Sequence, residues 1–231
     1  MTIVDTTTLG ELVAARPETA RILDLHGLDY CCHGQRTLAE ACRAAGLDPA
    51  AVAAELEAEP AGGDASWAAL PAPELADHIV ATHHRYLREE LPALEALAGK
   101  VATVHGERHA ELAEVERLVV MLRADLEPHL DKEERVLFPA IHALAAGRRA
   151  FPFGTVANPI RVMASEHDAA GDLLARLRAV TGGYAVPADG CASYQSLYGR
   201  LAELELDTHR HIHKENHSLF PAALALSETP A

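Results

Sequence analysis

Apolar residues recur along the chain at the three- and four-residue spacing of helices, and no segment keeps the strict alternation that a half-buried strand needs. Alanine, leucine, glutamate and arginine dominate the composition, which favours helices throughout. Gly- and Pro-containing stretches at 146–158 and 181–192 separate long amphipathic segments. The pattern predicts an all-α protein whose main part is an antiparallel four-helix bundle. The expected helices are 73–99, 106–145, 159–180 and 193–225.

Each of these four segments carries a histidine inside its apolar stripe, and two of them add a glutamate one turn later. Imidazole and carboxylate groups are metal-ligand types, so every stripe brings such a group to the predicted core. The expected buried stripes are Val80, His84, Leu87, Leu91 and Leu94; Leu122, Leu126, His129, Glu133, Val136 and Ala140; Met163, His167, Ala170, Leu174 and Leu177; and Leu204, Thr208, His211, Glu215 and Leu219.

The N-terminal quarter of the chain has a different pattern. Several short helical segments occur between residue 7 and about residue 58, and glycines punctuate them. Residues 59–66 combine Pro, Gly and small polar side chains, as domain connections do. We therefore expect a small helical, cysteine-bearing domain at 1–58, a linker at 59–72 and the bundle at 73–231.

Charge and composition narrow the class of function. The formal net charge is −14, which disfavours binding to nucleic acids and to anionic membrane surfaces. No long uncharged apolar run and no signal sequence is evident, so we expect a cytoplasmic protein. Four cysteines are too few for a disulfide framework, and we expect reduced thiols. Nucleotide-binding, serine-hydrolase and zinc-protease motifs are absent from the sequence, whereas histidine, with 14 residues, is abundant.

An internal repeat identifies which histidines matter. Residues 129–139 and 211–221 both read H-x-x-x-E-x-x-x-x-F-P. A histidine also precedes each copy at nearly the same separation, His84 by 45 residues and His167 by 44. Such a repeat indicates a duplicated helical hairpin with a pseudo-twofold core.

The repeat predicts a paired metal site. Residues four apart share a helical face, so each copy presents an imidazole and a carboxylate inward together. Burying Glu133 and Glu215 without a counter-charge would cost several kcal/mol, which two metal ions would offset. This donor set suits iron, manganese or zinc, with iron favoured for paired sites in bundles. The alternative for any one histidine is a hydrogen-bonded core residue. A second ladder at 209, 213 and 217 could also chelate metal, but its ligand types are not repeated in the other copy.

At this point the chain resembles the Repair of Iron Centres family, iron–sulfur cluster repair proteins with a di-iron, hemerythrin-like bundle. The resemblance covers nearly the whole chain. It rests on the segments 28–34 (LDYCCHG), 84–92 (ending in ELP), 129–133, 165–168 (SEHD) and 211–215.

The resemblance implies two non-haem iron ions per chain, joined by oxo and carboxylate bridges. It assigns four histidines as ligands and two glutamates as bridges, with His105 as a further or alternative ligand. It also implies functional acids at Asp125, which is usually a longer residue in the family, and at Glu166. The implied metal ligands are His84, His129, His167, His211, Glu133 and Glu215.

The adjacent thiols Cys31 and Cys32 match the family's paired cysteines. Such a pair can bind iron, supply two electrons by forming a disulfide, or exchange with a partner's disulfide. The alternative is two small buried side chains. Cys42 and Cys191 are expected to act only as small apolar residues.

Three functions remain open. The first is reduction of nitric oxide to nitrous oxide, which the resemblance implies. The second is donation of iron to iron–sulfur proteins damaged by oxidative or nitrosative stress. The third is a hemerythrin-like sensor that binds oxygen or nitric oxide. The expected partners are these small ligands and damaged iron–sulfur proteins, with a homodimer left open.

Overall fold

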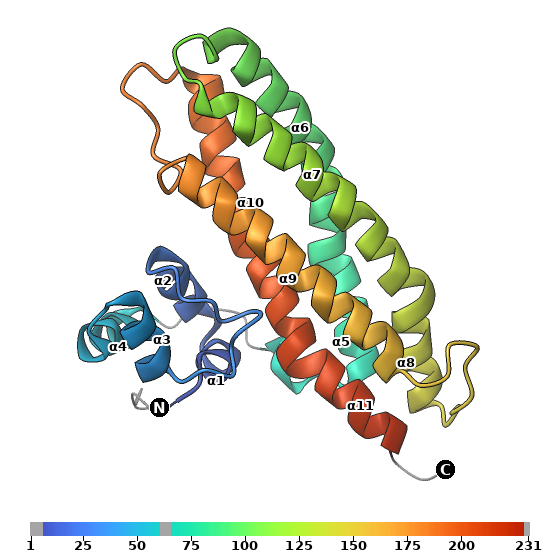
Figure 1. Cartoon of the computed structure of the whole chain (residues 1–231). Helices are drawn as coiled ribbons and strands as arrows, with labels where there is room; N and C mark the ends of the chain where they lie inside the picture. The colour runs from blue at the N-terminus through green and yellow to red at the C-terminus, as the bar shows by residue number, and fades with distance from the viewer. Residues whose placement is uncertain (1–6, 61–65, 229–231) are drawn as a thin grey trace. The chain divides into compact units, whose positions relative to one another are not determined.

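The computed structural model describes residues 7–60 and 66–228 (Figure 1). This part of the chain is helical and contains no β-strand, which confirms the predicted fold class. Residues 61–65 of the predicted linker lie outside the described residues. The elements are α1 (Leu9–Ala15), η1 (Pro17–Thr19), α2 (Ala20–Leu25), α3 (Leu38–Ala45), α4 (Pro49–Ala58), η2 (Ser66–Ala69), α5 (Ala72–Ile79), η3 (Val80–His84), α6 (Arg85–His105), α7 (Glu111–Lys132), η4 (Glu133–Leu137), α8 (Phe138–Ala145), α9 (Ala157–Val180), α10 (Ala192–Lys214), η5 (Glu215–Leu219) and α11 (Phe220–Glu228).

The four predicted long helices are confirmed, with α5–η3–α6, α7–η4–α8 and α10–η5–α11 each forming one nearly continuous helix. The first ends at His105, six residues beyond the predicted end. Its apolar stripe continues through Ala98 and Val101, which are both 1% exposed. Because that stripe remains buried, Gly99 does not stop the helix.

Three of these helices contain a π-helical turn, and each turn includes a predicted metal ligand: η3 ends at His84, η4 begins at Glu133 and η5 begins at Glu215. A π-turn holds one residue more than an α-turn and is common at functional sites. Phe138-Pro139 and Phe220-Pro221 follow the last two turns. Proline has no N–H to make the ordinary α-helical hydrogen bond, which is compatible with an irregular helical turn directly before it.

The π-turn at η4 changes which residues face the core. Simple helical spacing placed Val136 in the buried stripe, but Val136 is 42% exposed and this prediction is wrong. The extra residue in the turn rotates the next position inward, and Leu137 is fully buried. Ala140 is buried as predicted.

The chain divides by packing into two compact units. One is Ile79–Ala140 with Ala157–Thr208, and the other combines the N-terminal residues through His78 with Ile141–Val156 and the residues from His209 onward. This division cuts across the helices of the predicted bundle, so the domain boundaries expected from the sequence stay a prediction.

The unit Ile79–Ala140 with Ala157–Thr208 contains the core of the bundle. Its interior is mainly leucine and valine from α6, α7, α9 and the first part of α10. Ion pairs link neighbouring helices. Arg178 of α9 donates two hydrogen bonds, from Nε and Nη2, to the carboxylate of Glu205 in α10. Arg200 of α10 binds Glu90 of α6 in the same way. Glu205 is 2% exposed, so Arg178 compensates a buried charge.

In the other unit, α1 and α3 begin with matching capping boxes. Thr8 and Glu11 cap α1, and Thr37 and Glu40 cap α3. Backbone hydrogen bonds join the two helix starts, from Leu9 N to Arg36 O and from Leu38 N to Thr7 O. The segment between α2 and α3 carries the two adjacent cysteines. Over all the residues that the structure describes, no helix has the length and apolarity to cross a membrane.

Candidate metal centre

Glu133 lies between two of the predicted histidine ligands. Its side chain is fully buried, and its Oε2 is 3.4 Å from Nε2 of His84 and also 3.4 Å from Nε2 of His129. Nε2 of His129 is in turn 3.2 Å from Nε2 of His167. Three imidazoles therefore direct the same ring nitrogen toward one another and toward a buried carboxylate.

The opposite nitrogens of two of these rings are held by carboxylates. Nδ1 of His84 lies 3.0 Å from Glu134 Oε1, and Nδ1 of His129 lies 2.9 Å from Glu166 Oε2. A carboxylate accepts the proton of Nδ1–H, which leaves the lone pair on Nε2. This is the arrangement of metal-binding histidines, whose outer nitrogen is fixed by a carboxylate.

Both outer carboxylates are held as anions. Partial burial alone would raise the pKa of Glu134, but its hydrogen bonds with His84 and Arg88 outweigh burial and lower that pKa. Partial burial likewise opposes ionisation of Glu166, and its contacts with Lys132 and His129 lower the pKa. Charged acceptors hold an imidazole more strongly than neutral ones.

The second copy of the repeat presents the same ligand types. His211 Nε2 lies 3.0 Å from Glu215 Oε1, and both side chains are buried. Two groups of side chains could each hold a metal ion, because the ligand atoms of each group lie within 4.8 Å of one another. The groups are His84, Glu133, His211 and Glu215, and His129, Glu133, His167 and Glu215.

This donor set fits a pair of iron ions. Each group offers two imidazoles and two carboxylates, and both glutamates belong to both groups, as bridging ligands would. Two fully buried carboxylates need compensating positive charge, and metal cations supply it. Four protein donors leave positions open on an octahedral ion for a small ligand, and nitrogen and oxygen donors suit iron, manganese or zinc.

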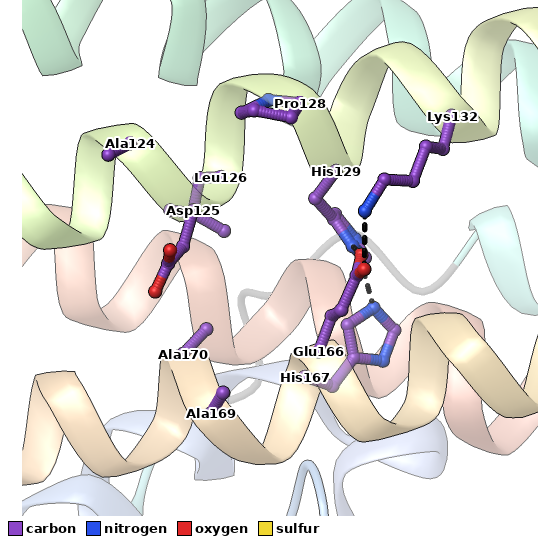
Figure 2. Close-up of a pocket in the computed structure, with 10 residues that line it drawn as sticks. All are labelled: Ala124, Asp125, Leu126, Pro128, His129, Lys132, Glu166, His167, Ala169 and Ala170. Carbon is purple, nitrogen blue, oxygen red and sulfur yellow. Dashed lines mark hydrogen bonds and ion pairs between the residues drawn. The ribbon is translucent and has the colours of Figure 1, made fainter.

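A pocket of about 270 Å³ between α7 and α9 reaches this group from the side of His129 and His167 (Figure 2). Glu166 and Lys132 form an ion pair at its wall. Asp125, an exposed residue, lines the same pocket one turn before His129. The structure therefore brings both predicted acids to one pocket. Of the two, Glu166 is the one that contacts a predicted metal ligand, His129.

His105 does not lie with the other predicted ligands. It is the last residue of α6, and 21 residues of helix at 1.5 Å each place it about 30 Å along the axis from His84. Its Nε2 instead lies 3.1 Å from Sγ of Cys191. Cys191 was expected to be a small apolar residue, but it is exposed, so that prediction is wrong; Cys42 is buried as expected.

The thiols of Cys31 and Cys32 are 3.7 Å apart in a loop organised by Asp29. Oδ1 of Asp29 accepts hydrogen bonds from the backbone N–H groups of both cysteines and of His33. Burial opposes ionisation of Asp29, but the hydrogen bonds from His33 and the cysteines lower its pKa to about 2. Contact with Cys32 and burial raise the pKa of Cys31 well above its usual range.

The residues that follow Glu215 hold this cysteine loop. Asn216 Nδ2 donates to the Cys31 carbonyl oxygen over 3.1 Å, and His217 Nε2 lies 3.1 Å from the same oxygen. A Cβ atom on Gly34 would lie 2.5 Å from His217 Nε2 and 2.3 Å from the Tyr30 carbonyl oxygen. The loop therefore needs glycine at this position.

The histidine ladder at 209, 213 and 217 also contacts the N-terminal segment. His209 Nδ1 lies 2.7 Å from Asp24 Oδ1, and the ring of Tyr30 packs edge-on against His209 and His213. Burial lowers the pKa of His213 to about 3, with the neighbouring His217 adding to the effect. In the first copy of the repeat the equivalent positions are Glu127, Asp131 and Arg135, so the histidine ladder belongs to the second copy alone.

The chain is similar to known proteins along nearly its whole length. Residues 75–223 match the hemerythrin HHE cation binding domain, and residues 5–59 match ScdA_N, a domain of unknown function (DUF542). The chain is similar to the iron–sulfur cluster repair protein YtfE of Musicola paradisiaca, with 39% identity over 94% of this chain and 95% of that protein. It is 37% identical to YtfE of an Enterobacter species over 94% of this chain and 96% of that protein.

The chain belongs to the YtfE family. The resemblance to the Repair of Iron Centres proteins is thereby confirmed. Within the YtfE-family chain, sequence reasoning missed Glu134 and Asn216, which occupy equivalent positions in the two copies of the repeat. The sequence could have pointed to both residues, because each directly follows a glutamate of the repeat and the two copies carry different residue types there.

Proposed function

We propose that this chain holds two iron ions and repairs iron–sulfur clusters damaged by oxidative or nitrosative stress. The observation that carries the proposal is the buried Glu133 between His84 and His129, with carboxylates fixing the outer nitrogens of both rings. The YtfE relatives are named iron–sulfur cluster repair proteins, which supports the role in repair. The proposed ligands are His84, His129, His167 and His211, with Glu133 and Glu215 as bridges.

Bound iron would supply either two electrons to couple two nitric oxide molecules into nitrous oxide, or the metal itself for a damaged cluster. The side chains around the iron would control how small molecules and protons reach it. The pocket between α7 and α9 offers a small molecule a path toward His129 and His167. Glu166 holds His129 on one side and pairs with Lys132 on the other, so it can relay a proton at the pocket wall.

Reduction of nitric oxide is the first of the two finer proposals. The donor set favours it, because four protein ligands for each iron would leave room for a small ligand to bind there. Asp125 and Glu166 line the pocket, where their carboxylates would pass protons inward from solvent. Water is the other product of joining two nitric oxide molecules, so each turnover consumes two protons.

Iron donation is the second finer proposal, and a separate observation favours it. Asn216 follows the proposed ligand Glu215 and contacts the main chain of Cys31. A thiol pair tied to a ligand-bearing turn could take up iron that leaves that turn. Cys31 is buried and its pKa is raised, so the more accessible Cys32 would bind first.

One experiment tests both proposals. The full chain is loaded with ferrous iron without oxygen, treated with nitric oxide and a reductant, and assayed for nitrous oxide and free iron together. Several equivalents of nitrous oxide with iron retained would support reduction. Iron release without nitrous oxide would support donation. Reversible nitric oxide binding with neither outcome would contradict both and favour a sensor.

A further inference from the structure

The end of α6 and the start of α10 lie at the same end of the bundle (Figure 1). Titratable side chains from the two elements meet there. Cys191 directly precedes α10 and is exposed, so solutes can reach its thiol. Its Sγ is 3.1 Å from Nε2 of His105, which is 5% exposed. A nucleophilic sulfur thus contacts a buried imidazole, the pairing that activates cysteine in many proteins.

The hydrogen bonds of His105 define the direction of this contact. A guanidinium nitrogen of Arg108 lies 3.3 Å from Nδ1 of His105. Because arginine can only donate, Nδ1 must accept, and the ring proton is then on Nε2. The Nε2–H group therefore points at Cys191 as a donor, and the acceptor that suits it best is a thiolate.

The start of α10 acts in the same direction. Backbone N–H groups of Tyr194 and Ser193 donate to the sulfur, and these bonds lower the pKa of the Cys191 thiol below its ordinary value. Helix N-termini stabilise thiolates in this way. Burial instead raises the pKa of Cys42, and contact with Cys32 raises that of Cys31.

The imidazole is held in place by its surroundings. The ring of His105 packs edge-on against Tyr194, with centroids 5.6 Å apart, and against His109 at 6.4 Å. The Tyr194 hydroxyl donates to Glu111, and His109 is paired with Asp189. A ring fixed in this way keeps Nε2 directed at the sulfur without further ordering.

We propose that Cys191, assisted by His105, forms a mixed disulfide with small disulfides that enter from solvent. The thiolate sulfur attacks one sulfur of the small disulfide, the S–S bond breaks, and the other half leaves as a thiolate that takes a proton from water. Cys191 is oxidised and the small disulfide is reduced, so no further redox partner is needed. This modification site is separate from the candidate metal centre.

The test uses the full chain, as purified, and glutathione disulfide at pH 7. Mass spectrometry of peptides measures the rate at which Cys191 gains the glutathione group, in the folded chain and in the urea-unfolded chain. We expect the folded chain to react about 5-fold faster or more, because the lowered pKa increases the thiolate fraction at this pH. The rate should also level off at a lower pH in the folded chain than in the unfolded one.

Two variants separate the effect of His105 on the reaction rate from the effect of the solvent exposure of Cys191. In His105→Gln, the rate at Cys191 should fall several-fold and its pH profile should move upward. In His142→Gln, which changes an exposed histidine of α8, the rate should be unchanged. A folded chain that reacts no faster than the unfolded chain would overturn the proposal, as would a His105→Gln variant with the wild-type rate and pH profile.

Discussion

Asn216 donates a hydrogen bond from its side-chain amide to the carbonyl oxygen of Cys31, over 3.1 Å. Asn216 directly follows Glu215, and the equivalent residue in the first copy of the repeat is Glu134, which holds His84. The duplicated motif therefore uses the same position for two tasks. One copy fixes a proposed metal ligand, and the other fixes the loop that carries the adjacent thiols.

Replacing Asn216 by alanine should loosen the cysteine loop. A hydrogen bond of this kind contributes about 1 kcal/mol, so local opening should become about 5-fold more frequent. Iodoacetamide labelling of the buried Cys31, followed by peptide mass spectrometry, measures this opening. Asn158→Ala, at an exposed position in α9, is the matched control and should leave the rate unchanged. Equal labelling in both variants would show that Asn216 does not hold the loop.

Replacing Glu134 by alanine should weaken metal retention without removing a proposed ligand. His84 would lose the acceptor for its Nδ1 proton, and loss of such a partner typically lowers metal affinity by about 10- to 100-fold. Competition for ferrous iron with a coloured chelator measures the change. Glu89→Ala, at an exposed position in α6, should retain the wild-type affinity. A Glu134→Ala variant that binds iron as the wild type does would contradict the role given to Glu134.

The π-turn at η4 predicts opposite results for two adjacent residues. Leu137 is fully buried, so Leu137→Ala should reduce the free energy of unfolding by about 2–5 kcal/mol. Val136 is 42% exposed, and Val136→Ala should change it by about 0.5 kcal/mol or less. Chemical denaturation of the metal-free chain gives both values. A larger loss of stability in Val136→Ala than in Leu137→Ala would show that the helix keeps its ordinary register and that Val136 faces the core.

Asp29 should contribute to stability in a defined pH range. Its pKa in the folded chain is lowered to about 2, whereas an unfolded aspartate titrates near 3.9. The contribution is therefore complete above about pH 4 and is lost as the pH falls through about 2. Asp29→Asn should be less stable than the wild type at pH 7, by about 1 kcal/mol or less because the carboxylate is partly exposed. Denaturant unfolding at several pH values measures this difference, and a gap that persists unchanged at pH 2 would exclude the charge of Asp29 as its cause.

The sequence was sufficient to predict the helices and the two copies of the repeat, because apolar spacing and the H-x-x-x-E pattern are local signals. It could not reveal the π-turns, since one extra residue in a turn leaves the composition unchanged, and Val136 was therefore placed in the core. The contact between His105 and Cys191 was also hidden, because 86 residues separate them in the chain. Only the packing of α6 against α10 joins them.

The central claim is that Glu133 and Glu215 bridge two iron ions. Iron content after anaerobic loading and gel filtration tests it directly, in the wild type and in Glu133→Ala and Glu215→Ala. Circular dichroism of the metal-free variants checks the fold, which we expect to persist because each change removes a buried charge. We predict two iron ions in the wild-type chain and loss of the pair in either variant. Two iron ions retained in both folded variants would contradict the account.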